Sequence, residues 1–319
     1  MSEVGGIPAS VSGLVFGSQE LGAGGSALRI LPPPVTAGDD EASQSSSQLK
    51  WLERVSSVPL HVQYAYACHL WDGEERGAAL SVMRSMLDRS GGVMVKAAGG
   101  GLHPNMAGGE SSPPLEESRS SGELAILAKG WLRYGEWELQ GEVGVGTERT
   151  SVLALSSPAD RSAISLALER CGYATELDPT SYKAWHKLGM LHFEIVQSDK
   201  EEGEDDLSVS RPRSRSSAGA VSIALTHVVP AVDAFFRSIS LGKQRQLQDK
   251  LRLLTLWFQH GGDLRVDHAV TQGLNMAPVD TWLDVMPQII ARIHSPKPTV
   301  RSAVLALLGR IAQAHPQGL

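Results

Sequence analysis

The sequence predicts an all-α fold, built as a solenoid of stacked helix pairs, and three observations support this prediction. Apolar residues recur at three- and four-residue spacing along most of the chain. No convincing run of alternating apolar and polar residues suggests a strand. Tryptophan, glycine, alanine and proline recur at the spacing of repeated helix pairs. We therefore expect helical repeats over 48–243 and a second kind of helical repeat over 244–319.

Several stretches lack the helical period and are rich in glycine, serine, proline or charge. Fifteen of the 33 glycines fall in 1–47 and 91–109. Such a composition buries too little apolar surface to offset the entropy lost on ordering. We expect a disordered extension over 1–47 and disordered insertions at 90–120, 140–159 and 198–220, which leaves about 200 residues for folded structure.

Composition also excludes several classes of protein. The net charge is −6, so nucleic acid is not an expected partner. No apolar run of 18 residues is present, so we expect no direct membrane insertion. The N-terminus lacks the basic region of a secretory signal. Cys68 and Cys171 are the only cysteines, which is typical of a reducing compartment. The prediction is a cytoplasmic protein.

The first half of the chain predicts five helices. Block 48–89 predicts two helices joined by a turn at Gly73 and Gly77. A third is expected over 121–139, with an apolar face of Leu124, Leu127, Trp131 and Tyr134. Asp160 is a suitable N-cap for a fourth helix over 160–177, and a fifth follows over 181–197 after the break at Asp178 and Pro179.

The second half is almost continuously helical from residue 221 onward. Three apolar faces carry the period, the second and third being separated by the break at 295–298. The first face consists of Leu247, Leu251, Leu254 and Phe258, the second of Trp282, Val285, Met286, Ile289, Ile290 and Ile293, and the third of Val300, Val304, Leu307, Leu308 and Ile311.

Two consecutive units match the tetratricopeptide repeat, a helix pair with tryptophan and glycine in its first helix and alanine and phenylalanine in its second. In both units the helices are separated by an insertion at the same point. The first unit is carried by Trp131, Tyr134, Gly135, Ala167, Ala174 and Pro179. The second is carried by Trp185, Leu188, Gly189, Ala231, Phe235 and Ser238, with His192 at the tyrosine position.

The C-terminal part matches the HEAT repeat. Pro287, Ser295, Val300 and Arg301 have its spacing, with serine in place of the usual aspartate. The proline is expected to bend the first helix of the pair, and the arginine to cap the stack between repeats.

No catalytic constellation is present, so we expect no enzyme in this chain. The common phosphate-loop, dinucleotide, serine-hydrolase and zinc-protease motifs are absent. His186 and His192 lie on different faces of one helix, so we interpret them as packing or surface residues rather than metal ligands. Cys171 belongs to a core stripe, and we expect no metal site.

A cluster of basic residues is the candidate binding site. Lys129 and Arg133 are four apart and share a helix face, and stacking could bring Lys183 of the next repeat close to them. Three converging cations suit a phosphorylated small molecule, whereas the alternative is a solvated face without a ligand. In the basic insertion, Ser216 follows Arg211 and Arg213 at positions that suit a basophilic kinase, so it is the candidate phosphorylation site.

Four segments carry a resemblance to a known family. They are SYKAWHKLGMLHFE at 181–194, the stretch 228–258, VDTWLDVMPQIIARIHSPKP at 279–298 and AHPQ at 314–317. Together they closely resemble the FAT region of the target-of-rapamycin kinases, which belong to the phosphatidylinositol 3-kinase-related kinases. Weaker echoes at 61–71 and 131–140 keep the same order.

The resemblance implies a partial FAT domain over 48–319, a helical solenoid that clamps and regulates a kinase domain located downstream. The catalytic elements of the kinase fall beyond Leu319, so the chain is expected to be a fragment of a larger serine/threonine kinase or a truncated gene model. It also implies an inositol-polyphosphate pocket, with inositol hexakisphosphate as candidate ligand and no other cofactor. Lys129, Arg133 and Lys183 match basic positions of that pocket, with arginine replacing lysine at 133.

The implied function is a non-catalytic scaffold in nutrient and growth signalling. Its partners would be the kinase domain of the parent chain and the subunits of the target-of-rapamycin complexes. Through these subunits it would reach the lysosomal or vacuolar membrane surface. The alternative is a stand-alone helical-repeat adaptor that binds other proteins.

Overall fold

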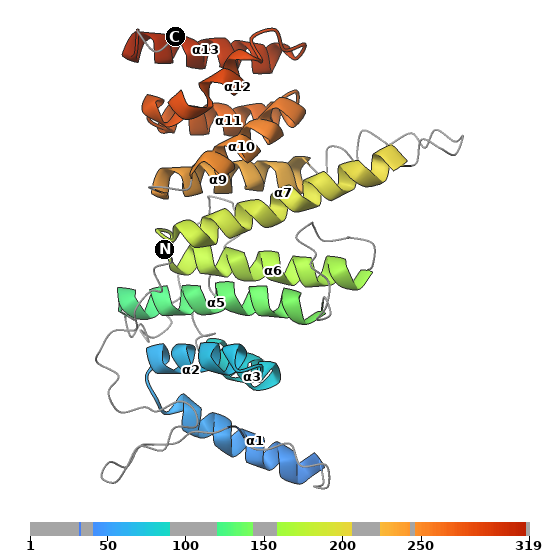
Figure 1. Cartoon of the computed structure of the whole chain (residues 1–319), viewed down its shortest axis with the longest axis vertical. Helices are drawn as coiled ribbons and strands as arrows, with labels where there is room; N and C mark the ends of the chain where they lie inside the picture. Colours follow the sequence, from blue (N-terminus) through green and yellow to red (C-terminus); the bar gives the residue numbers. More distant parts are fainter. Residues whose placement is uncertain are drawn as a thin grey trace, which may run out of the picture. The chain divides into compact units, whose positions relative to one another are not determined.

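The computed structural model confirms the all-α helical-repeat fold, as Figure 1 shows. It describes residues 32, 41–89, 120–142, 158–205, 224–242 and 246–316. Within these ranges the chain forms helices and turns and no strand. None of the helices in this part of the chain is long and apolar enough to span a bilayer. The chain divides into two compact units, Met1–Gly130 and Trp131–Leu319.

In the N-terminal unit, the described residues 41–89 form the helix pair expected over 48–89 and a helix before it. The additional helix α1 (Glu41–Ser56) precedes α2 (Leu60–Asp72) and α3 (Arg76–Asp88). Helices α2 and α3 pack closely against each other, and α1 packs against α3. Their apolar faces form the buried core of this unit, which includes Trp51, Val55, Tyr66, Ala67, Leu70, Ala79, Val82, Met83, Met86 and Leu87.

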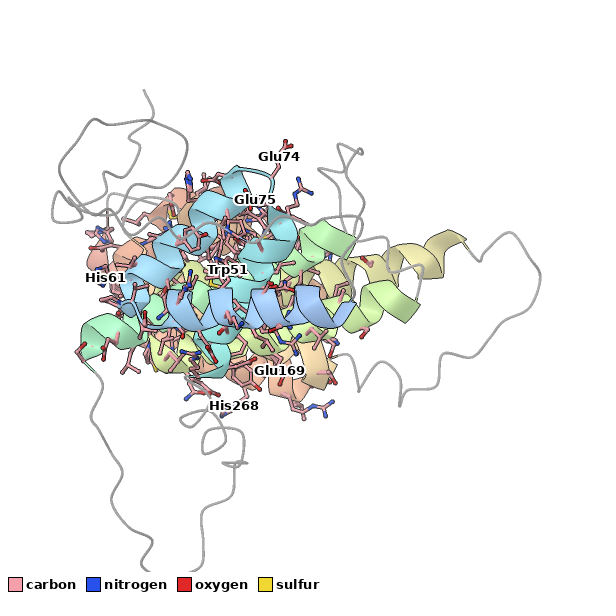
Figure 2. All side chains as sticks on the ribbon, turned by 90° about the horizontal axis from the view of Figure 1, so that it is seen from below. Trp51, His61, Glu74, Glu75, Glu169 and His268 are labelled. Atoms are coloured by element: carbon pink, nitrogen blue, oxygen red, sulfur yellow. The ribbon has the colours of Figure 1, made fainter. Side chains whose placement is uncertain are left out.

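The turn between α2 and α3 has the hydrogen bonds of a Schellman motif. The backbone N–H of Glu75 donates to Leu70 O at 2.9 Å, and that of Glu74 donates to Trp71 O at 3.1 Å. Glu74 has a φ of 65°, in the left-handed region that normally takes glycine. Its exposed side chain points away from the helices in Figure 2. Gly73, expected to form this joint, lies one residue earlier and has a φ of −84°.

Helix α5 (Ser121–Glu142) continues from the first unit into the second, where α6 (Pro158–Leu177) and α7 (Tyr182–Asp205) follow it. Ala167, Cys171 and Leu191 form a small buried cluster with Leu132, Leu139, Leu168 and Leu188 packed around it. The break between α6 and α7 is fixed by Asp178, which accepts the backbone N–H of Thr180 at 3.1 Å.

The main core of the C-terminal unit surrounds α9 (Val229–Leu241). A π-helical turn η2 (Ala224–Val228) leads into α9, and α10 (Gln246–His260) and α11 (Leu264–Met276) follow. Helix α9 packs against α7, α10 and α11. At Gly189 of α7, a Cβ would lie 3.0 Å from the ring of Phe235, so the lack of a side chain lets α7 and α9 approach closely. These two residues were predicted to belong to one helix pair.

The last helix pair begins with an irregular first helix. A 3₁₀ segment η3 (Val279–Val285) passes into the short helix α12 (Met286–Ile290), with Pro287 in its first turn. Helix α13 (Pro298–Ala314) is the second member. Trp282, Val285, Ile289, Val300, Val304, Leu307 and Ile311 join the core that surrounds α9.

The cap between successive helix pairs is formed by other residues than Arg301. Lys297 donates from Nζ to Phe258 O at 3.0 Å, and Arg310 donates to Leu274 O at 2.8 Å. These cations satisfy carbonyl groups near the C-termini of α10 and α11. Arg301 instead donates to Ser295 O at 3.3 Å, in its own loop.

Several predicted boundaries differ from the observed helices. Helix α1 begins at Glu41, seven residues before the expected start of the folded part at 48, α5 extends to Glu142, and α7 extends to Asp205. The extension of α7 is rich in Glu, which has a high helix propensity, and extending an existing helix avoids the cost of nucleation. Most of 1–47 and the central parts of the three expected insertions lie outside the described residues.

Three of the four residues of the apolar face predicted for α10 pack into the core, where Leu254 is buried and Leu251 and Phe258 are half-buried. Leu247 is 47% exposed, whereas Leu253, Leu254, Leu256 and Trp257 are buried. The buried face of α10 is wider than predicted, and it includes the polar residues Asp249 and Lys250, which apolar periodicity cannot identify.

Candidate functional site

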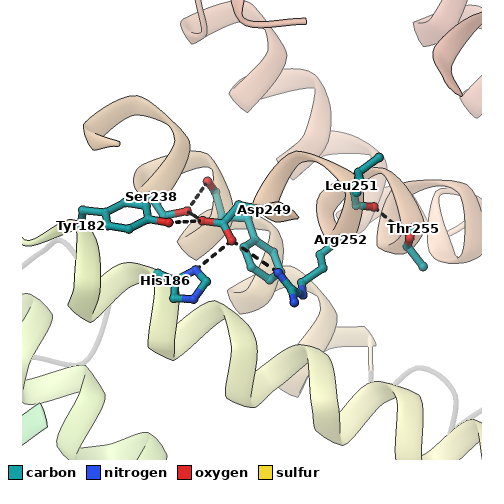
Figure 3. A network of polar contacts seen from close by, with 8 residues as sticks. Tyr182, His186, Ser238, Asp249, Leu251, Arg252 and Thr255 are labelled. Atoms are coloured by element: carbon teal, nitrogen blue, oxygen red, sulfur yellow. Dashed lines mark hydrogen bonds and ion pairs between the residues drawn. The ribbon is translucent and has the colours of Figure 1, made fainter. Parts of the chain in front are cut away.

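A buried carboxylate joins three helices of the C-terminal unit, as Figure 3 shows. Asp249 of α10 has no exposed surface. Its Oδ1 lies 2.8 Å from Nδ1 of His186 on α7, and its Oδ2 accepts the hydroxyl of Ser238 on α9 at 2.8 Å. Tyr182, also on α7, donates to Oδ2 at 3.3 Å, and Arg252 approaches Oδ1 at 3.8 Å. Four side chains therefore converge on one carboxylate.

This arrangement has the residue types of a serine-hydrolase triad but not its connectivity. In a triad the histidine stands between the serine and the aspartate, so that it can take the hydroxyl proton. Here Ser238 and His186 each bind Asp249, and Ser238 also donates to Phe235 O at 3.0 Å. The geometry fixes α7, α9 and α10 to one another and does not activate the serine hydroxyl.

A second polar contact joins α7 to the π-helical turn before α9. Nδ1 of His192 lies 3.1 Å from Nδ1 of His227, so one ring must donate to the other. Burial, and then the neighbouring His227, lower the pKa of His192 to about 4. The imidazole of His192 is therefore neutral at pH 7.

The cations predicted to bind a phosphorylated ligand are exposed. Lys129 lies on the part of α5 that belongs to the N-terminal unit, whereas Arg133 and Lys183 lie in the C-terminal unit on α5 and α7. Glu136 lies 3.6 Å from NH1 of Arg133 through Oε2 and 3.7 Å from Nζ of Lys187 through Oε1. Lys187 is one turn after Lys183 on the same face of α7. The Glu136 bridge therefore connects the basic face of α7 to that of α5.

Lys187 and Asp249 were missed by the sequence reasoning. Lys187 could have been found, because it follows Lys183 by four residues on the same helix face. For Asp249 no comparable signal exists, because its partners on α7 are more than 60 residues away. Ser216, the candidate phosphorylation site, lies outside the described residues.

Cys171 has the surroundings of a packing residue rather than those of a reactive one. Burial raises the pKa of the Cys171 thiol to about 12, so the reactive thiolate does not form at neutral pH. Among the residues that the structure describes, no group of three His, Cys, Asp or Glu side chains could hold a metal ion.

Comparison with known proteins matches residues 39–255 to the FAT domain family. The serine/threonine-protein kinase TOR2 of Saccharomyces cerevisiae is 33% identical over 282 residues, which cover 81% of this chain and 10% of the yeast protein. The kinase tor1 of Schizosaccharomyces pombe is 31% identical over 275 residues, covering 84% of this chain and 10% of that protein. The kinase mTor of Drosophila melanogaster is 35% identical over 211 residues, which cover 65% of this chain and 8% of that protein. The chain thus spans about a tenth of the length of these relatives.

Proposed function

Because this chain belongs to the FAT domain family, we propose that it is the non-catalytic helical scaffold of a TOR-type serine/threonine kinase. In this role it clamps and regulates the kinase domain of the parent chain in nutrient and growth signalling. The observation that carries the proposal is the continuous core of the C-terminal unit, in which each helix from α7 to α13 is packed against its neighbours. A scaffold of this kind acts by holding the surfaces that it presents in fixed relative positions.

The polar contacts between helices give this core its rigidity. Asp249 joins α7, α9 and α10. Lys250, 4% exposed, donates from Nζ to both carboxylate oxygens of Asp284 at 3.0 Å and so joins α10 to η3. Displacing the partner of a buried polar group costs free energy, because the group is then left without a hydrogen bond. These contacts therefore resist sliding between repeats. A load applied by the kinase domain at one end would therefore be transmitted along the stack.

A chimera of the yeast relative would test the scaffold role. The segment of TOR2 from Saccharomyces cerevisiae that matches this chain is replaced by residues 39–319, and kinase activity is measured on the purified protein. We expect activity in the chimera and a severalfold loss on Asp249→Ala, whereas the exposed Asp72→Ala keeps it. Equal activities of the two variants would contradict a scaffold that acts through its core. Separately, a transcript that ends at Leu319 would favour the alternative, a stand-alone adaptor.

We also propose that the basic face formed by Arg133, Lys183 and Lys187 in the C-terminal unit binds inositol hexakisphosphate. The Glu136 bridge supports this, because a phosphate could replace Glu136 as the partner of the two cations near it. Calorimetry with inositol hexakisphosphate would compare the wild type with Lys183→Glu, Lys187→Glu and the exposed control Lys50→Glu. We expect affinity to fall about tenfold or more for the first two only. Equal affinity in all four proteins would exclude this site.

The cellular setting follows from the same proposal. In the parent kinase the scaffold would assemble with the other subunits of a TOR complex in the cytoplasm, and through them at the lysosomal or vacuolar surface. Fractionation of cells that express the chimera would test this. A membrane-associated pool that disappears when the complex subunits are depleted is the expected result, and a pool that persists without them would contradict it.

A further inference from the structure

The last helix pair is basic, although the chain as a whole has a net charge of −6. Residues 286–319 contain four Lys or Arg residues and no Asp or Glu; the four are Arg292, Lys297, Arg301 and Arg310. The acids that precede this segment after residue 260 are Asp263, Asp267, Asp280 and Asp284. The opposite charges are thus separated along the sequence. Whether they form ion pairs with each other depends on the fold.

Folding gives three of these acids partners outside the group of four basic residues. Asp263 lies 2.8 Å from Arg265, Asp280 lies 2.6 Å from His315, and Asp284 lies 3.0 Å from the buried Lys250. Within the described residues, Arg292 and Arg301 form no ion pair. Both side chains are exposed, as is that of His294 between them. The charges of the two guanidinium groups are therefore available to a partner.

Contacts at the end of α10 bring the basic residues to one place. The guanidinium carbon of Arg292 lies 5.2 Å from the ring centroid of Phe258. Nζ of Lys297 donates to the carbonyl of the same Phe258 at 3.0 Å. Arg301 donates to Ser295 O at 3.3 Å, which holds its side chain against the loop that carries Lys297. Arg292 thus contacts the end of α10, and Arg301 contacts the loop that Lys297 joins to the same end. We call these two arginines, together with His294, which is next to Ser295 in this loop, the basic junction.

We propose that the basic junction binds an acidic segment of a partner protein. Two exposed guanidinium groups can each hold a carboxylate through paired hydrogen bonds, and His294 adds a third donor. Pro296 and Pro298 restrict the loop that carries these groups, so little order is lost on binding. The number of charges favours a peptide, because adhesion to an anionic membrane usually takes clusters of about four to eight cations. Single-stranded nucleic acid would need an aromatic platform, whereas Arg292 already occupies Phe258.

Binding of a fluorescein-labelled octapeptide of alternating Asp and Glu, followed by fluorescence anisotropy with the full chain, would test the proposal. The variant is Arg292→Glu with Arg301→Glu. The control is Lys50→Glu with Arg54→Glu on α1, which changes the net charge equally at two other exposed residues. We expect the junction variant to bind about tenfold more weakly or worse, and the control to stay within about twofold of the wild type. Circular dichroism spectra of all three proteins should coincide.

Three outcomes would overturn the proposal. The wild type could fail to bind the peptide, or both variants could weaken binding equally, which would indicate an effect of overall charge. The wild type could also bind vesicles containing thirty per cent phosphatidylserine, or a single-stranded RNA, more tightly than the peptide. That last result would assign the basic junction to another class of partner.

Discussion

Asp249 shows how much one buried residue can contribute to a helical stack. Replacement by alanine removes the acceptor shared by the buried Ser238 and the half-buried Tyr182 and His186. We expect Asp249→Ala to lower the free energy of unfolding by about 2–4 kcal/mol, because unpaired buried polar groups keep their desolvation cost. Urea denaturation followed by circular dichroism would measure it. The exposed Asp72→Ala should change stability by less than about 0.5 kcal/mol; similar losses for both would show that the network is not important.

His192 makes the stability of the C-terminal unit depend on pH. Its pKa in the folded chain is about 4, below the ordinary value of 6.5, because burial and then His227 disfavour the charged form. The unfolded chain therefore takes up the proton first as pH falls. The contribution of neutral His192 is complete above pH 6.5 and is lost as pH falls from 6.5 towards 4, by up to about 3 kcal/mol.

Urea denaturation at pH 7 and pH 4.5 would measure this contribution. His192→Leu has no imidazole to protonate, so its stability should fall less between the two pH values than that of the wild type. The reverse order, or identical losses, would show that protonation of His192 is not linked to folding.

At the scale of helices, the junction between α2 and α3 contains local strain that can be removed. Glu74 is held at a φ of 65° by the Schellman hydrogen bonds. Glycine adopts this conformation without the steric cost of a Cβ, which is about 1 kcal/mol. Glu74→Gly is therefore expected to raise the free energy of unfolding by about 0.5–1 kcal/mol, measured by urea denaturation. Glu75→Gly, one residue later, should instead be neutral or destabilising, and stabilisation by both would refute the explanation.

The helices also show which parts of the fold a sequence can predict. Apolar spacing predicted α2, α3, α5, α6 and α7, and tetratricopeptide spacing predicted that Gly189 and Phe235 belong to one helix pair, where they are in contact. These signals are local or follow a repeat. Apolar spacing identified Leu251, Leu254 and Phe258 of α10 as core-facing, but it included the exposed Leu247 and did not identify the buried Asp249 and Lys250, whose partners lie on other helices. Burial of a polar residue depends on tertiary contacts, which leave no period in the sequence.

At the scale of the whole molecule, helix order and family could be predicted, but charge pairing could not. The absence of acids after Asp284 is visible in the sequence. Which cations remain exposed depends on the fold. Lys297 and Arg310 are half-buried and donate to carbonyl groups of α10 and α11, whereas Arg292 and Arg301 are exposed. The same holds for the candidate anion site. The contact between Glu136 and Lys187 could not be predicted from the sequence, because it forms only when α5 and α7 are packed.

The distribution of buried contacts predicts an order of stability along the chain. Helix α9 packs against α7, η2, α10 and α11, and its residues Ala231, Val232 and Phe235 have no exposed surface. By contrast, α1 buries Trp51 and Val55 while Leu49 is 61% exposed. Amides exchange through local opening, whose free energy rises with the buried contacts that must be broken. We therefore expect hydrogen exchange, followed by mass spectrometry on the full chain, to be slowest in α9 and the facing parts of α10 and α11, and faster in α1.

The variant Asp249→Ala tests whether exchange depends on contacts between helices or only on the stability of each helix by itself. Loss of the shared carboxylate should accelerate exchange in α7, α9 and α10, which it joins, and leave α2 and α3 of the other unit unchanged. A scaffold that transmits load needs this cooperation among neighbouring helices, because a stack whose repeats open independently would yield at its weakest junction. Exchange that rises in α10 alone would mean that the network does not couple the three helices, and that the stack does not transmit load as one body.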